Sequence, residues 1–297
     1  MKPLTLTRRF AGILGGILAI LSLAAPCPAG DRTIIWMTSD FPPVSIPKGP
    51  LKDQGYCDVI QKAIQKRMPG YTHESLIGNM NRLYHEYRRG HPVCSVSLYK
   101  TPEREAFIEF SIPSTFTLPN RLIFRAEDAG RFGETESISL ATVLEEQTIR
   151  LGIAANRSYG RPLDTVLDRH RETGTLFVYV GDDLFENLLR MLVAGRLDAV
   201  LGLPEEVMFV AEGLGVRDAI KSVALTETLD DPRAWIGHVG CSKTDWGRAV
   251  IDAVNRAIRS ARPTAEYRRA YERWLDAEGK GIYRRFYDQV FLRTDGH

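Results

Sequence analysis

Residues 94–111, CSVSLYKTPEREAFIEFS, predict a buried strand that leads through a turn into the first turn of a helix. Val93–Leu98 alternates apolar and small residues, which is the period-two pattern of a strand. Thr101 suits the N-cap of a helix, and Pro102 suits its first turn. Arg104 is therefore expected just beyond the carboxyl end of a strand. Open α/β sheets bind ligands there, and a guanidinium suits a carboxylate or phosphate.

The motifs around this stretch resemble the extracellular solute-binding proteins of family 3, the polar amino-acid receptors of ABC importers. The first lobe of that family runs strand, Gly-aromatic-acid helix, second helix, strand, T-x-E-R and an aromatic-Ser turn. The same order occurs here as IIWMTSDFPPV, GYCDVIQKAI, NRLYHEYRRG, VCSVSL, TPERE and FIEFS. The resemblance implies an α/β protein with a two-lobed periplasmic-binding-protein fold of type II-like form. Each lobe would be a mixed sheet flanked by helices, and two hinge crossovers would join the lobes.

The resemblance also implies which first-lobe residues bind the ligand. Arg104 would hold a ligand carboxylate, and Ser97 and Tyr99 would offer hydroxyl groups beside it. Phe41 stands where the family has an aromatic side chain that stacks on the ligand.

Two of these residues also have plainer interpretations. Without the flanking motifs, Arg104 is a solvated first-turn residue that pairs with Glu103 or Glu109. Phe41 lies beside two prolines and can equally plug the surface of its lobe.

A second set of candidates follows a later strand. Ile149–Ala154 is apolar and predicts a strand, and residues 156–160 form the turn after it. A turn from strand to helix offers backbone N–H groups to an anion. Ser158 matches a family position that helps to hold the ligand carboxylate. Asn156 and Arg157 are lateral candidates, although such residues are more often plain turn residues.

The chain departs from the family at one binding position. In the amino-acid receptors, the second-lobe strand ends with an aspartate that pairs with the α-ammonium of the ligand. Alignment of GRLDAVLGLPEE on that pattern places Leu203 there. We therefore expect a ligand that carries a carboxylate or a similar anion and either lacks an α-ammonium or presents its amine elsewhere. Glu205 would replace the missing acid if the turn were one residue longer.

A weak internal repeat predicts the two lobes from residues alone. An amphipathic helix that ends at a glycine is followed by a strand twice, as RLYHEYRRG with HPVCSVSL and as NLLRMLVAG with RLDAVLGL. Extended segments at 114–122 and 221–229 flank the second copy and are expected to cross between lobes. We assign residues 31–117 and 226–297 to lobe 1 and residues 118–225 to an inserted lobe 2. The ligand would lie between the lobes, which would close around it.

The start of the chain has the pattern of a secretory signal peptide. Residues 1–29 combine a basic start, an apolar run and a small-residue end. We assign residues 1–30 to this peptide, with cleavage after Ala29 or Gly30, and expect a periplasmic protein. The apolar run is short for a bilayer-spanning helix, so an uncleaved anchor is the less favoured alternative.

Charge and motif content argue against several classes of function. The 297 residues include 39 basic and 37 acidic side chains, and three of the basic ones lie in the leader. A nearly neutral mature chain without a basic patch argues against nucleic acid as a partner. No Ser-His-acid or Cys-His set and no nucleotide-binding glycine pattern is present. We expect no catalytic residues and no cofactor.

Three cysteines belong to the expected mature chain: Cys57, Cys94 and Cys241. They lack metal-ligand spacing, so no metal is expected. An oxidising compartment permits one disulfide. Cys94 and Cys241 fall in the same lobe of our assignment, so we favour this pair and expect Cys57 to be free. Three buried thiols are the alternative.

The leading function is a monomeric solute-binding protein with a small-molecule ligand and an ABC permease as partner. Two alternatives come with the fold. One is a sensor, in which the liganded protein docks on a membrane signalling receptor. The other is an enzyme, because the fold is also known for dehydratases of small cyclic carboxylic acids, in which a carboxylate acts as acid or base.

Overall fold

The computed structural model describes residues 32–132, 135–155, 157–180 and 183–294. The expected signal peptide, residues 1–30, lies outside the described residues, and so does Asn156. Residues 32–297 form one compact unit, to which everything below refers. In the described ranges, no helix has the length and apolar character needed to span a bilayer.

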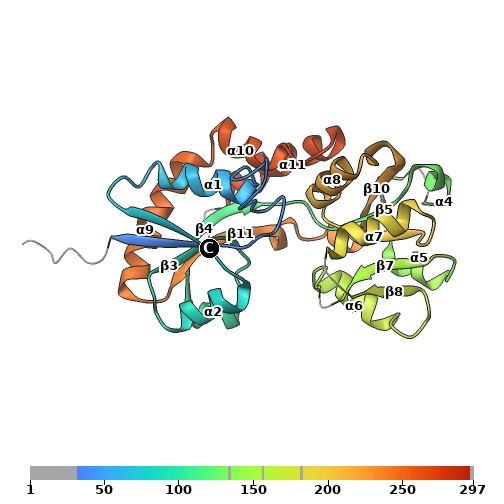
Figure 1. The fold of residues 1–297 in the computed structure, drawn as a ribbon, viewed down its shortest axis with the longest axis horizontal. Coiled ribbons are helices and arrows are strands. Elements are labelled where there is room, and N and C mark those ends of the chain that lie inside the picture. The colour runs from blue at the N-terminus through green and yellow to red at the C-terminus, as the bar shows by residue number, and fades with distance from the viewer. Residues whose placement is uncertain (1–31, 133–134, 156, 181–182, 295–297) are drawn as a thin grey trace, which may run out of the picture. The chain divides into compact units, whose positions relative to one another are not determined.

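The first sheet has the strand order β2-β1-β3-β11-β4 (Figure 1). Its strands are β1 (Thr33–Thr38), β2 (Thr72–Ile77), β3 (Val93–Leu98), β4 (Ile108–Phe116) and β11 (Ile236–Ser242). Strand β1 is parallel to β2 and β3, whereas β11 is antiparallel to β3 and β4. The sheet is therefore mixed.

The second sheet has the order β6-β10-β5-β9-β7-β8. Its strands are β5 (Arg121–Arg125), β6 (Ser137–Ile138), β7 (Leu151–Ala154), β8 (Leu176–Tyr179), β9 (Ala199–Gly202) and β10 (Ile220–Leu225). Strand β7 is parallel to β8 and β9, and β5 is antiparallel to β9 and β10. Three parallel strands followed by an antiparallel one thus occur in both sheets, so the expected two-lobed α/β fold is confirmed.

Helices surround each sheet (Figure 1). Around the first sheet lie α1 (Tyr56–Gln65), α2 (Met80–Arg88), α3 (Pro102–Glu105), α9 (Asp245–Ala261), α10 (Ala265–Glu272) and α11 (Ala277–Gln289). Around the second lie α4 (Ala129–Phe132), α5 (Leu140–Glu145), α6 (Arg161–Arg169), α7 (Leu184–Val193) and α8 (Pro204–Leu214).

The helix-glycine-strand repeat is present in the structure. Helix α2 is followed by Gly90 and strand β3, and α7 by Gly195 and β9. Both glycines have positive φ angles, +69° and +71°. This left-handed conformation ends a helix without the steric penalty that a Cβ would bring. The glycine therefore stops the helix and turns the chain into the strand in each lobe.

Alternation along the strands builds a core on both faces of the second sheet. On β5, Leu122 and Phe124 belong to one apolar cluster and Ile123 to another. Successive side chains of a strand point to opposite faces, so these two clusters lie on the two sides of the sheet. The α4–α6 helices contribute to the first cluster and the α7 and α8 helices to the second.

Two short segments carry the chain between the sheets. Residues 117–120 join β4 to β5, and residues 226–235 join β10 to β11. The two segments touch, because the N–H of Thr117 donates to the carbonyl of Trp235 at 3.3 Å. Our division at residues 117/118 and 225/226 is a proposal about which residues move together as a lobe.

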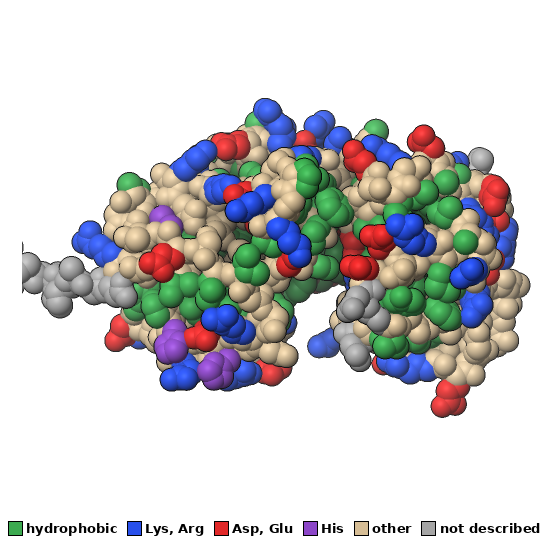
Figure 2. Space-filling view, in the orientation of Figure 1, with side chains coloured by type: hydrophobic (Ala, Val, Ile, Leu, Met, Phe, Trp, Pro, Cys, Tyr) green, Lys and Arg blue, Asp and Glu red, His purple; other side chains and the backbone are tan. Residues whose placement is uncertain are grey.

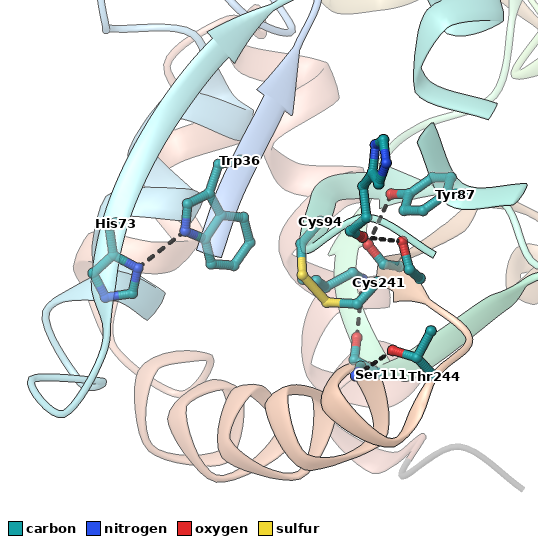
Figure 3. The surroundings of a disulfide bond; sticks show 12 residues. Trp36, His73, Tyr87, Cys94, Ser111, Cys241 and Thr244 are labelled. Carbon is teal, nitrogen blue, oxygen red and sulfur yellow. Dashed lines mark hydrogen bonds between the residues drawn. A yellow bond between two sulfur atoms is a disulfide. The ribbon is translucent and has the colours of Figure 1, made fainter. Parts of the chain in front are cut away.

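A disulfide joins Cys94 on β3 to Cys241 on β11 (Figure 3). The two residues are register partners on neighbouring antiparallel strands, and their Cα atoms are 4.1 Å apart. Both are fully buried. Beside them, the hydroxyl of Tyr87 donates to the carbonyl of Gly240 at 2.8 Å. Cys57 is a free, buried thiol, and burial raises its pKa.

Non-reducing peptide mapping should therefore recover the Cys94 and Cys241 peptides as one cross-linked species. Cys57 should be alkylated only after denaturation, because a buried thiol with a raised pKa reacts slowly. Alkylation of all three cysteines in the denatured, unreduced protein would contradict the pairing.

Candidate functional site

A cavity of about 800 Å³ is lined by residues of both lobes. Figure 2 shows the surface hollowed between the part built on the first sheet and the part built on the second. From lobe 1 come Phe41, Tyr99 and Arg104. The rest of the lining is Asn120, residues 157–162, Leu203 and, from the segment 226–235, Glu227, Thr228, Asp230, Asp231, Ala234 and Trp235.

Arg104 reaches this cavity from the first turn after β3. The Thr101 hydroxyl accepts the N–H of Arg104 at 3.3 Å and caps α3, as the sequence predicts. The guanidinium donates from Nη1 to the carbonyl of Tyr99 at 2.8 Å and lies 5.4 Å from the ring centre of Tyr84. No salt bridge to Arg104 occurs among the described residues, which include Glu103 and Glu109. Its positive charge therefore has no carboxylate partner in the described part of the chain.

The aromatic candidates line the cavity, whereas Ser97 does not. Phe41 and Tyr99 are 42% and 44% exposed. The loop that carries Phe41 is closed by two backbone hydrogen bonds between Phe41 and Ser45, at 3.2 and 3.0 Å. The Ser97 hydroxyl instead accepts that of Thr115 at 2.9 Å within lobe 1, and Ser97 has a positive φ of +65°. The hydrogen bond of Ser97 therefore links the end of β3 to β4 within lobe 1.

The second-lobe turn is already occupied by contacts within its own lobe. Arg157 donates from Nη1 and Nη2 to the two oxygens of Glu206, at 2.9 and 2.6 Å. The hydroxyl of Ser158 donates to Asp164, which also accepts the N–H of Tyr159 at 2.8 Å. Arg157 and Ser158 line the cavity, but the charge of Arg157 is balanced by Glu206.

The end of β9 offers no carboxylate to the cavity. Leu203 lines it, whereas Glu205, two residues on, is fully buried. Its Oε2 accepts the hydroxyl of Tyr271 on α10 at 2.7 Å. Burial raises the pKa of Glu205 to about 7. The structure thus directs Glu205 to lobe 1 and not to the cavity wall.

Sequence reasoning missed part of the lining. Asn120 lies in the first crossing segment, and Asp230 and Asp231 lie in the second. None of them belongs to a motif, so only their position between the two sheets marks them. Trp235, at the end of the second crossing segment, is 8% exposed and also lines the cavity. Within the described part of the chain, no group of His, Cys, Asp and Glu is arranged to hold a metal ion.

Comparisons by sequence find no relative. No protein-family model matches the chain, and no curated protein matches it.

Solved structures, by contrast, are similar in fold. An ancestral cationic amino acid solute-binding protein matches with a TM-score of 0.62 and 15% identity, over 82% of this chain and 96% of its own. The second substrate-binding domain of an amino acid ABC transporter from Streptococcus pneumoniae, itself described as putative, matches with a TM-score of 0.58 and 15% identity, over 82% and 100%. A histidine kinase sensor domain that resembles periplasmic binding proteins matches with a TM-score of 0.55 and 16% identity, over 82% and 95%. At such identities, the similarity establishes a shared two-lobed fold.

Proposed function

We propose that the chain is a periplasmic solute-binding protein that captures a small carboxylate-bearing or amino-acid-like ligand between its lobes for an ABC importer. One observation carries the proposal: Arg104, beyond the end of β3, presents a guanidinium without a carboxylate partner among the described residues to a cavity lined by both lobes. A planar guanidinium binds a carboxylate with two parallel hydrogen bonds. Phe41 and Tyr99 add exposed aromatic surface beside it.

Ligand capture would use the two crossing segments as hinges. Residues 117–120 and 226–235 are the covalent links between the sheets, so a change of a few backbone torsions in them moves one lobe against the other. The closed protein would dock as a monomer on its permease. The neighbours in fold include binding domains of amino acid transporters, which supports this role.

Mass spectrometry of small molecules released from purified, denatured protein tests the function. We expect a carboxylate to co-purify in a near-stoichiometric amount. Incubation of that compound with fresh protein should return it unchanged, whereas a dehydrated product would favour the enzymatic alternative. Absence of any released compound, together with no binding of carboxylates in calorimetry, would overturn the proposal.

A sensor role is the second candidate, because a histidine kinase sensor domain shares the fold. Cross-linking of the protein in intact cells separates the two roles. An ABC permease among the cross-linked partners supports import, and a membrane histidine kinase supports sensing.

If the protein is exported, its intact mass should be that of a chain without the signal peptide. The order of charged, apolar and small residues in 1–29 should direct secretion and cleavage after Ala29 or Gly30. The intact mass of protein from the periplasmic fraction should match a chain that begins at Gly30 or Asp31. A full-length mass in the membrane fraction would contradict it.

A further inference from the structure

Asn120 brings an unused hydrogen-bond acceptor to the cavity. It lies between β4 and β5, is 4% exposed and lines the cavity. Its Nδ2 donates to the carbonyl of Tyr159 at 3.1 Å. A carbonyl can only accept, so this bond fixes which end of the amide is nitrogen. Oδ1 is buried and, among the described residues, no group donates to it.

An acceptor in this position needs a donor. A buried polar atom that loses its hydrogen bond costs about 1 to 3 kcal/mol, and most such atoms in folded proteins are paired. Next to Tyr159, Gly160 has a φ of +97°, and a Cβ built on it would stand 3.0 Å from the ring of Trp235. The amide cannot turn without breaking its bond to Tyr159, and Asn120 lines the cavity, so a ligand held there can supply the missing donor.

The charges of the lining favour a donor that carries positive charge. Of the three arginines in the lining, Arg157 is balanced by Glu206 and Arg104 is assigned to the ligand carboxylate. Arg161 is then the one positive charge of the described lining that stands against three carboxylates of the segment 226–235, Glu227, Asp230 and Asp231. Asp231 also caps its own turn by accepting the N–H of Arg233 at 3.0 Å. These carboxylates lower the electrostatic potential of the cavity around them, and a cation is stabilised there.

The acceptor on Asn120 does not lie at the position after β9 where an α-ammonium would be bound. Leu203, which follows β9, offers no carboxylate to an α-ammonium, whereas Asn120, in the crossing segment 117–120, offers an acceptor. We propose that the ligand is a zwitterion whose amino group is remote from its carboxylate. Its carboxylate binds Arg104, and its amine donates to Oδ1 of Asn120. This inference rests on the proposed function, since it assumes that the cavity is the ligand site.

Calorimetry with three matched series of straight-chain probes tests the inference. The first is butanoate, pentanoate and hexanoate; the second carries a terminal amine, as in 4-aminobutanoate, 5-aminopentanoate and 6-aminohexanoate; the third carries the amine on the α-carbon. We expect at least one terminal amine to bind at least tenfold more tightly than the plain and α-amino compounds of the same length. Equal binding of the plain or α-amino compound would overturn the inference and leave the carboxylate-binding function intact.

Variants at Asn120 give the second test. Asn120→Ala should abolish the tenfold preference, so that the plain and terminal-amine compounds of the same length bind with similar affinity. Asn120→Asp keeps an acceptor and adds negative charge, so it should retain or increase the preference for the terminal amine. A preference that survives in Asn120→Ala would overturn the inference.

If none of the probes binds, the chemistry of the compound that co-purifies with the protein decides whether the inference holds. A released ligand with an amine away from its carboxylate supports the inference, and one without such a group overturns it. If no compound is released and no carboxylate binds, the proposed function itself fails.

Discussion

Arg104→Ala is expected to weaken ligand binding by about 2 to 5 kcal/mol, which is a loss of about 30-fold to several thousandfold in affinity. The guanidinium uses one N–H on the carbonyl of Tyr99 and faces the cavity without a carboxylate partner in the described structure. A bound carboxylate that loses it would stay desolvated and unpaired. Titration calorimetry with the compound released from the purified protein measures the effect.

Two matched variants show whether the loss comes from Arg104 itself. Arg104→Lys keeps the charge and loses the planar fork, so its affinity should lie between those of wild type and Arg104→Ala. Arg161→Ala removes an exposed arginine from the same cavity lining and should change affinity less than tenfold. Unchanged affinity in Arg104→Ala, or equal losses in Arg104→Ala and Arg161→Ala, would contradict the role of Arg104.

The fold was predictable because its decisive signals are local. Val93–Leu98 combines apolar and small residues and forms a strand, Thr101 and Pro102 begin a helix, and Gly90 and Gly195 end helices with positive φ angles. Each of these signals acts within a few residues, so a sequence carries it without knowledge of the rest of the chain. The repeat then indicated two similar sheets, and the structure contains them.

The site was predictable only where a motif fixes it. Arg104 follows its strand directly, so its place at the cavity was foreseeable. Ser97 belongs to the same motif, yet its hydroxyl accepts a hydrogen bond from Thr115 within lobe 1. Asn120 and the pairing of Arg157 with Glu206 depend on contacts between distant segments. The sequence contains no motif that predicts such contacts.

Glu205 is another residue whose role comes from a distant contact. Glu205 lies in the first turn of α8, in lobe 2, and its carboxyl group accepts a hydrogen bond from the hydroxyl of Tyr271 on α10, in lobe 1. That hydroxyl also accepts the N–H of Leu118 in the first crossing segment, at 2.8 Å. Glu205 thus ties both lobes and a hinge together. Its second oxygen, Oε1, is buried and has no donor among the described residues.

Burial has a larger effect on the pKa of Glu205 than the hydrogen bond from Tyr271, which lowers that pKa. Tyr56, Tyr271 and Cys57 have pKa values raised by burial, so they are neutral between pH 4 and 8. The nearby charges are Glu206, which raises the pKa of Glu205, and Arg157, which lowers it. Because Arg157 is already bound by Glu206, this pair gives Glu205 little net stabilisation. Burial therefore dominates and raises the pKa of Glu205 to about 7.

The free energy of unfolding of the wild type should fall as the pH rises, and Glu205→Gln should not show this fall. In the unfolded chain, a glutamate has a pKa of about 4.3, so the folded state binds the proton more tightly. Wild-type stability should fall through the window from about pH 4 to 7, by about 3 kcal/mol for a difference of between two and three pKa units. Glutamine keeps an acceptor for Tyr271 and does not ionise.

Urea unfolding at pH 5 and pH 8 measures the change, and Glu212→Gln, on the exposed side of α8, should behave as wild type. Equal losses in wild type and Glu205→Gln would show that the carboxyl is ionised, without penalty, in the folded protein.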